Sequence, residues 1–371
     1  MKFVKEGMKW LDWIAFSGLM LIILAAYTTG SGFNKMIAHA GPIICGILIV
    51  LFFNHVDWIQ ALKNRDRELL LSLFAGILAV INMILSKSGP GVLFDITNFV
   101  LIIYLADKVK IDDKILCLIT ITFIIIWVYF FIVNPKGYNP NTHSMIVFEA
   151  CAISTIGISA FLKERKKVWL IYVYVLIAFL GVSIPISMEY KGRTTIVGII
   201  ILLSFFFLIP GSIWNIKKLY KILWGAILAF STALPLLVFL FMAQGWKIPF
   251  RKYVLNGREI AWEQYIAAWL KEPWTGIGND YLSKIPDLRF YNVHNGPLHI
   301  LTVYGIFLFI VAMVLLGKKL LRINTEALNI TKRFGLCLLV SMFSIAIMET
   351  YVIISFSNIV FFLALIAVFR E

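Results

Sequence analysis

The sequence contains many long runs of apolar residues with no charged side chain. The run from Ile115 to Ile132 is continuously apolar and does not alternate with a period of two. A helix needs about 20 apolar residues to cross a bilayer, whereas the strands of a transmembrane barrel would alternate. Since hydrophobic residues make up 61% of the chain and charged residues 15%, the pattern predicts an all-α, polytopic integral membrane protein.

About twelve such runs lie between the charged segments. No repeat of fixed period and no Gly/Ser-rich or Pro-rich linker divides them, so we predict a single transmembrane domain over residues 1–371. The first run follows three lysines but lacks a small-residue cleavage site, and we expect it to remain as an uncleaved helix. The predicted spans are residues 13–30, 37–56, 69–86, 91–106, 115–133, 145–162, 168–186, 194–210, 222–243, 297–316, 334–349 and 351–369.

The distribution of Lys and Arg predicts the orientation of these spans, because short cytoplasmic loops are enriched in both residues. With the N-terminus inside, the predicted cytoplasmic segments hold 22 of the 34 basic residues. Seven of the remaining 12 fall in one long external segment, where the rule is weakest. We therefore expect both termini to be cytoplasmic.

Several function classes lack their sequence signals. The net charge of +14 is accounted for by topology and by anionic lipid head groups, so no nucleic-acid site is predicted. Walker A, HExxH and GxSxG sequences are absent, which argues for chemistry that needs neither a metal nor another cofactor. Disulfides and zinc sites are not expected, because no CxxC spacing occurs among the four cysteines, which are Cys45, Cys117, Cys151 and Cys337.

Residues 244–296, between the ninth and tenth spans, form the one segment long enough to fold outside the bilayer. Loops of this length are usually functional or disordered. Within it we predict a helix from Glu259 to Leu270, because Pro273 lies just beyond its end. The helix is expected to lie on the membrane interface or to pack against the bundle through a stripe of Trp262, Ile266, Trp269 and Leu270.

Three external residues are candidates for chemistry. His294 lies at the external end of the tenth span, and a neutral imidazole there is suited to accept a proton from a hydroxyl nucleophile. Arg193 begins the eighth span and Arg258 the predicted loop helix, where a guanidinium fork is suited to phosphate oxygens. The alternatives are a structural interface histidine and arginines that act as snorkelling membrane anchors.

Three carboxylates interrupt apolar runs, namely Asp95, Glu149 and Glu349. Intramembrane carboxylates are costly and are candidates for proton or ion pathways or for contacts to sugar hydroxyls. Each of them also lies close enough to a span end to be an interface residue.

Several short motifs follow one another along the chain. They are, in chain order, Asn139-Pro140-Asn141, Gly192-Arg193-Thr194, Arg258 four residues before Trp262, a P-x-x-G-x-G turn from Pro273 to Gly278, and an H-N-x-x-L segment from His294 to Leu298 followed by Tyr304-Gly305-Ile306. This ordered set resembles the O-antigen ligase and O-antigen polymerase superfamily of bacterial membrane glycosyltransferases. The resemblance is carried mainly by residues 187–310, while the N-terminal half agrees only in topology. Lys191-Gly192 precede Arg193 where that superfamily frequently has a serine.

The resemblance implies a GT-C-like helical bundle in the bacterial cytoplasmic (inner) membrane that transfers glycan, with inversion, from an undecaprenyl-diphosphate-linked oligosaccharide to a hydroxyl of an acceptor glycan or glycolipid. His294 would be the general base, and Arg258 and Arg193 would hold the diphosphate. Membrane lipids and other polysaccharide assembly proteins are the further partners it implies. The substrate-binding residues it implies are Arg251, Lys252, Asn295, Trp262, Gly276 and Gly278.

Two further functions remain open. The same motifs fit a ligase that moves finished glycan to a lipid A core or another acceptor, and a polymerase is favoured because the loop is compact. A secondary transporter or lipid-linked sugar flippase would show pseudo-symmetric halves, and the long loop has no counterpart in the other half of the chain.

Overall fold

The computed structural model describes residues 6–28, 33–135, 138–246, 255–326, 328–352 and 355–370. All regular elements in these ranges are helical, which confirms the predicted all-α class. The helices are α1 Lys9–Thr28, α2 Phe33–His55, α3 Trp58–Lys63, α4 Arg67–Leu85, α5 Gly91–Leu105, α6 Asp113–Val133, α7 Pro140–Glu164, α8 Val168–Leu176, the π-helical η2 Ile177–Ser183, α9 Ile184–Glu189, α10 Arg193–Leu208, α11 Gly211–Trp214, α12 Lys217–Ala243, α14 Arg258–Trp269, α15 Tyr281–Lys284, α16 Gly296–Leu321, α17 Ile330–Ala346 and α18 Ser355–Phe369.

Seven helices in the described ranges are long and apolar enough to cross a membrane. A helix also lies at each of the other five predicted positions, and four of these five contain shorter apolar segments. The membrane crossing of these shorter helices stays a prediction. The seven long helices are Lys9–Thr28, Arg67–Leu85, Asp113–Val133, Pro140–Glu164, Val168–Glu189 (α8, η2 and α9 taken together), Lys217–Ala243 and Gly296–Leu321.

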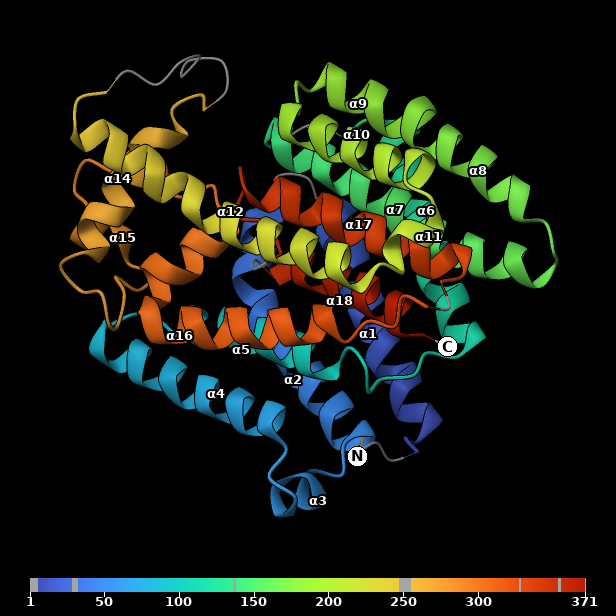
Figure 1. Ribbon diagram of the computed structural model, residues 1–371, viewed down its shortest axis with the longest axis horizontal. Coiled ribbons are helices and arrows are strands. Elements are labelled where there is room, and N and C mark those ends of the chain that lie inside the picture. The colour runs from blue at the N-terminus through green and yellow to red at the C-terminus, as the bar shows by residue number, and fades with distance from the viewer. Residues whose placement is uncertain are drawn as a thin grey trace.

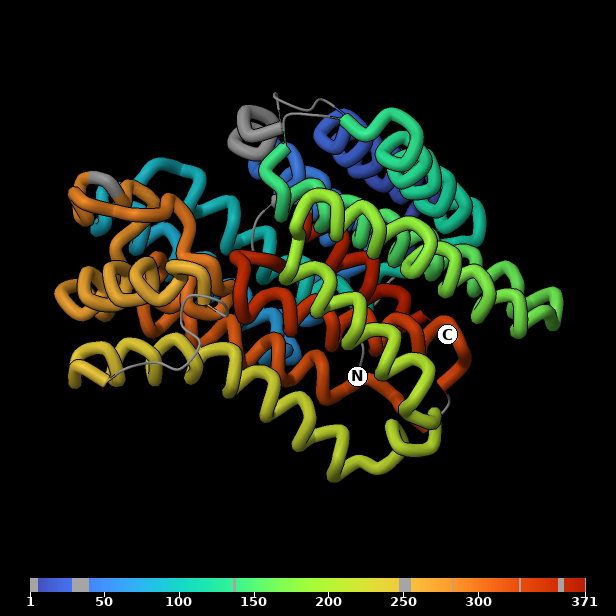
Figure 2. Tube along the Cα trace, turned by 90° about the horizontal axis from the view of Figure 1, so that it is seen from above, coloured from blue at the N-terminus to red at the C-terminus, as the bar shows by residue number. Residues whose placement is uncertain are grey.

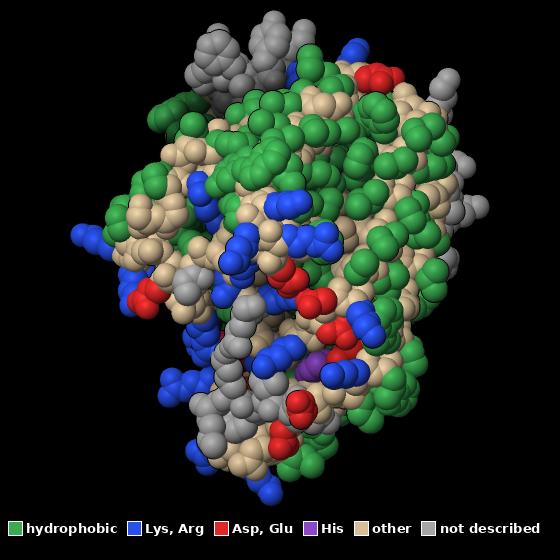
Figure 3. Space-filling view, turned by 90° about the vertical axis from the view of Figure 1, so that its right-hand side faces the viewer, with side chains coloured by type: hydrophobic (Ala, Val, Ile, Leu, Met, Phe, Trp, Pro, Cys, Tyr) green, Lys and Arg blue, Asp and Glu red, His purple; other side chains and the backbone are tan. Residues whose placement is uncertain are grey.

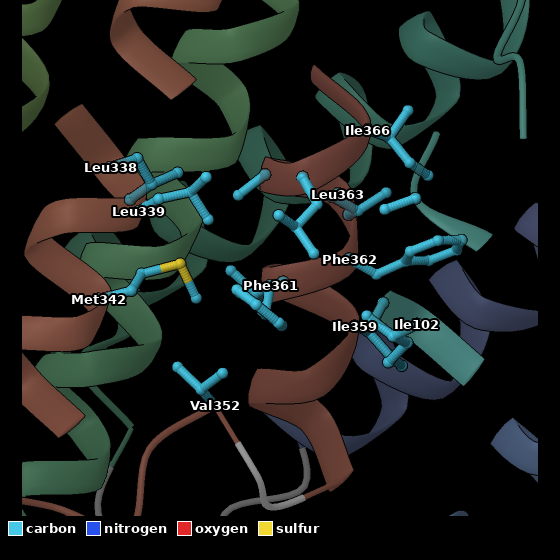
Figure 4. Packing of buried hydrophobic residues seen from close by; sticks show 14 of the residues in the cluster. Ile102, Leu338, Leu339, Met342, Val352, Ile359, Phe361, Phe362, Leu363 and Ile366 are labelled. Atoms are coloured by element: carbon cyan, nitrogen blue, oxygen red, sulfur yellow. The ribbon is translucent and has the colours of Figure 1, made fainter. Parts of the chain in front are cut away.

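The hydrophobic core is centred on α18. Figure 4 shows Phe361, Phe362 and Leu363 of this helix between α17 and α5. The Phe361 ring packs against Phe99 of α5, with ring centroids 6.0 Å apart, and Phe362 packs against Phe16 of α1. Figure 2 shows α17 and α18, in red, between α12 at one edge of the molecule and α1 and α6 at the other. Every residue from Ile359 to Val368 is buried.

Contacts between the connecting segments divide them into two groups at opposite ends of the bundle. At one end, the Asn134 amide after α6 donates to Glu189 at the end of α9, with an N–O distance of 3.0 Å. At the other end, the Lys319 ammonium of α16 lies 2.6 Å from Asp107 after α5 and 3.3 Å from Glu68 of α4. The start of α4 and the end of α5 therefore lie at the same end of the bundle, and these two helices run in opposite directions, as neighbouring membrane spans would.

The end that contains Lys319 is the predicted cytoplasmic end. Figure 3 shows Lys and Arg side chains gathered on the side of the molecule at the right of Figure 1, where the C-terminal end of the described chain lies. The predicted external segment lies at the left of Figure 1, where α14 lies beside the end of α12 and the start of α16.

The predicted bounds of the last two spans, 334–349 and 351–369, are wrong where the two spans meet. Helix α17 ends at Ala346 and α18 begins at Ser355, so Glu349 lies in the connecting segment and not inside a helix. Asp95 and Glu149 do lie within helices, in α5 and α7.

The turn at residues 273–278 pairs with a break in α16. Helical geometry is interrupted at Gly305, where φ is 82° and ψ is 170°. The carbonyl of Val303, freed by this break, accepts a hydrogen bond from the amide of Gly278, and the freed amide of Ile306 donates to Pro273. The break therefore leaves these backbone groups paired, because the turn supplies their hydrogen-bond partners.

We expect Gly276→Ala to destabilise the protein by about 2 kcal/mol or more. Gly276 has a φ of +71°, and a Cβ atom there would lie 2.5 Å from the Val303 carbonyl oxygen and the Gly305 nitrogen, which are backbone atoms. Gly225→Ala in α12 is the control, because its Cβ would meet no atom within 4 Å. Thermal unfolding in detergent measures both, and equal midpoints for the two variants would contradict the proposed backbone contact.

Candidate functional site

Three side chains from separate segments meet at the predicted external end. Helix α14 provides Arg258, the segment before α16 provides His294, and the segment after α17 provides Glu349. Glu349 Oε1 lies 2.5 Å from Arg258 Nη2, and Glu349 Oε2 lies 2.8 Å from His294 Nδ1. The two residues that were expected to act together are therefore joined through a carboxylate that the sequence did not link to either of them.

The Glu349 carboxylate is nearly enclosed, with 6% of its side chain exposed. A third donor, the Asn141 amide in the first turn of α7, lies 3.0 Å from Oε1. Burial opposes ionisation, but the hydrogen bond from His294 and the charge of Arg258 outweigh it and lower the pKa of Glu349. Glu349 is therefore a carboxylate, which can only accept hydrogen bonds.

The imidazole of His294 is fixed in one orientation. Because Glu349 can only accept, Nδ1 of His294 carries the hydrogen and Nε2 is the basic nitrogen. Among the described residues, no hydrogen bond is formed by Nε2, and 20% of the His294 side chain is exposed. His294 also adopts a φ of 53°, held by hydrogen bonds from its amide to Asn292 at 3.0 Å and Thr350 at 3.1 Å.

Most of the N–H groups of Arg258 form hydrogen bonds to other parts of the protein. Its Nε donates to the Met348 carbonyl at 2.7 Å and its Nη1 to the Leu255 carbonyl at 3.4 Å, in addition to the ion pair with Glu349. Within the described ranges, two of its five N–H groups form no hydrogen bond, and 11% of the side chain is exposed. Arg258 therefore holds the segment that carries Glu349 in place.

Asn295 and Trp262 occupy buried structural positions, although both were expected to bind substrate. The Asn295 side chain accepts from the amide of Leu298 at the start of α16 and donates to the carbonyls of Ser231 and Ile347. The Trp262 indole donates to the Val293 carbonyl at 2.9 Å. Neither side chain is exposed, so both position the segment that carries His294.

The predicted loop helix packs against the bundle, the second of its two expected positions. Trp262 and Ile266 are buried in a small core formed with residues of α12, α16 and the 277–293 segment, whereas Leu270 is 55% exposed.

The other residues of the predicted site contribute differently. Gly276 and Gly278 belong to the backbone pairing described above, and Arg251 and Lys252 lie outside the described residues.

Arg193 lies near this cluster but does not contact it. It is the first residue of α10 and is exposed, and its side chain forms no hydrogen bond or ion pair within the described ranges. The preceding Gly192 packs against Ser144 of α7, where an added Cβ would lie 2.1 Å from the hydroxyl oxygen. Ser144 is one turn from Asn141, so Arg193 lies at the same end of α7 as the Glu349 contact.

Glu149 belongs to a different part of the bundle. Its carboxylate is buried within α7 and accepts a hydrogen bond from the Tyr27 hydroxyl of α1. Glu149 lies eight residues along α7 from Asn141, about 12 Å deeper in the bundle. It is therefore not part of the cluster around His294.

Comparison with known proteins gives no relative for this chain. No protein-family model, no curated protein and no solved structure matches it.

Proposed function

We propose that this protein is a polysaccharide polymerase that transfers glycan from an undecaprenyl-diphosphate-linked donor to a hydroxyl of a lipid-linked repeat unit. The observation that carries the proposal is the hydrogen bond between Glu349 and His294 Nδ1, which leaves Nε2 as the basic nitrogen of a partly exposed imidazole. Twelve membrane crossings, a GT-C-like arrangement and a site on the external side of the bacterial cytoplasmic membrane are parts of the same proposal.

The proposed reaction is a single displacement at the anomeric carbon of the donor. The acceptor hydroxyl oxygen bonds to this carbon while Nε2 of His294 takes the hydroxyl proton. The bond between the carbon and the diphosphate oxygen breaks, and the electron pair leaves with the diphosphate, which stays on its lipid. The configuration at the carbon is inverted, and Glu349 stabilises the imidazolium that forms.

Charge develops on the departing diphosphate, and cations near it would stabilise the transition state. Arg193 supports this role because it is exposed and unpaired in the described part of the chain, so its whole guanidinium is available. The two unused N–H groups of Arg258 would add to it. No metal is required, because the sugar diphosphate bond is already activated.

Reconstitution with purified lipid-linked repeat units tests the proposal directly. We expect a ladder of glycan products on a gel, with a yield that excess EDTA leaves unchanged, because protein cations and not a metal ion stabilise the leaving group. A single transfer to an added acceptor would indicate the ligase instead. Movement of the intact lipid-linked unit across the vesicle membrane without any glycosidic product would contradict both enzymes.

A further inference from the structure

The turn of residues 273–278 lies within the length of two apolar helices and not beyond their ends. The amide of Gly278 donates to the carbonyl of Val303, which is seven residues from the start of α16, about 10 Å along that helix. On the other side of the turn, the side-chain amide of Asn82 donates to the carbonyl of Thr275, and Asn82 is three residues before the end of α4. Both helices are long and apolar enough to cross a membrane, and Figure 1 shows them side by side. A bilayer that contains both helices therefore also reaches this turn.

The backbone of the turn is hydrogen-bonded in the way that such a depth requires. A non-helical segment is tolerated in hydrocarbon only where protein groups satisfy its amides and carbonyls, because no water is available to them. Hydrogen bonds are formed by the amides of Gly276, Ile277 and Gly278 and by the carbonyls of Pro273 and Thr275. The pairing that stabilises the break in α16 therefore also allows the turn to lie in lipid.

The outer surface of the turn is aromatic and continues the apolar faces of the two helices. Trp274 is 63% exposed and stacks on Phe307 of α16, which is 49% exposed, with ring centroids 5.3 Å apart and an interplanar angle of 22°. Positions 307, 310 and 314 share one face of α16. Exposed apolar side chains lie on that face and on the last two turns of α4, namely Ile310 and Val314 of α16 and Ile81, Ile84 and Leu85 of α4.

The residues before the turn change from charged to apolar over a short distance. Lys271 is exposed, and the carboxylate of Glu272 lies 2.6 Å from the ammonium of Lys284. The exposed indole of Trp274 follows two residues later. Tryptophan is enriched where the head groups of a bilayer meet its acyl chains, so this order is the one expected for a chain that enters the membrane surface from water.

We propose that the turn of residues 273–278 enters the external leaflet of the membrane, with Trp274 and Phe307 in contact with lipid at the boundary between head groups and acyl chains. A bound sugar or a second copy of the chain would account for the exposed aromatic pair alone. Lipid accounts for the pair, for the adjoining apolar faces of α4 and α16, and for the paired backbone of the turn. The proposal does not depend on the glycan transfer proposed above.

Spin labelling of the full-length protein in phosphatidylethanolamine–phosphatidylglycerol vesicles tests this proposal. Single cysteines carry a nitroxide at positions 274, 307, 310 and 314, in a background in which the exposed Cys117 is replaced by serine. Collision with oxygen, which concentrates in lipid, and with a water-soluble nickel chelate is measured by power saturation. The thermal unfolding midpoint of each labelled protein shows whether it is folded, and the label at 307 reports on the same surface without altering the turn.

The matched control is a label at Tyr291, an aromatic residue of the same external segment that is 71% exposed. We expect collision with the nickel chelate to be several-fold lower at 274 and 307 than at 291, and collision with oxygen to be higher. We expect positions 274 and 307 to report similar depths. Positions 310 and 314 should lie about 5 and 10 Å deeper than 307, because an α-helix rises 1.5 Å per residue.

Two results would overturn the proposal. Equal access of the nickel chelate to 274, 307 and 291 would place the aromatic pair in water, where a glycan is the better candidate for its partner. Exclusion of both oxygen and the nickel chelate from 274 and 307 would show that protein covers the pair, as in an interface between two copies of this chain.

Discussion

Replacing His294 with alanine is expected to lower the rate of glycan transfer by about 10²- to 10⁴-fold, the usual contribution of a general base. The expected loss arises because Nε2, the nitrogen left free by the Glu349 hydrogen bond, is removed. Ladder formation from lipid-linked repeat units, followed over time, measures this rate.

His294→Asn is the informative control for this variant. Asparagine tolerates the left-handed backbone conformation that His294 adopts, with a φ of 53°, and its amide is suited to donate to Glu349 in place of Nδ1. We expect it to unfold near the wild-type temperature and still to lack activity. An active and stable His294→Asn protein would rule out His294 as the base.

Replacing Arg258 with alanine is expected to destabilise the protein by about 3–5 kcal/mol, because it leaves the buried carboxylate of Glu349 without its cationic partner. The double variant Arg258→Ala with Glu349→Gln removes that charge and should recover much of the loss. Chemical unfolding of both proteins measures the difference. An Arg258→Ala protein as stable as the wild type would show that the ion pair does not hold the Glu349 segment in place.

The same pair predicts a dependence of stability on pH. The pKa of Glu349 is lower in the folded protein than its ordinary value. Its contribution is therefore fully present above the ordinary carboxyl pKa and is lost as pH falls through the lowered one. We expect the difference in unfolding free energy between the wild type and the variant Arg258→Ala with Glu349→Gln to become smaller as the pH falls.

The positions of the helices could be predicted from the sequence because membrane helices are separated by charged segments. The predicted spans and the observed helices overlap at every one of the twelve positions. The boundary error that changes the place of a candidate residue surrounds Glu349, because Met348 on one side and Tyr351 and Val352 on the other continue the apolar run through a connecting segment. Hydropathy does not register a turn made of apolar residues.

The partners within the site could not be predicted in the same way. His294 and Arg258 belong to recognisable local motifs, but Glu349 is 55 and 91 residues from them along the chain, and only the folded bundle brings the three together. Asn295 and Trp262 lie in the same motifs, and their types suit a buried cap and a buried packing residue as well as a ligand contact. The available signal was Glu349 itself, an acidic residue in an apolar run with no basic residue close to it in the sequence.

The central position of α18 has a consequence for synthesis. This helix follows, in the chain, all the helices that surround it, including α1, α2, α5, α7 and α17. During translation the earlier helices are made first, so they must remain in the bilayer with their inward faces uncovered until α18 arrives. A chain cut before Ser355 would therefore lack the helix on which the hydrophobic core is centred. We would expect quality-control proteases to degrade that product, because its remaining helices cannot form a smaller stable bundle.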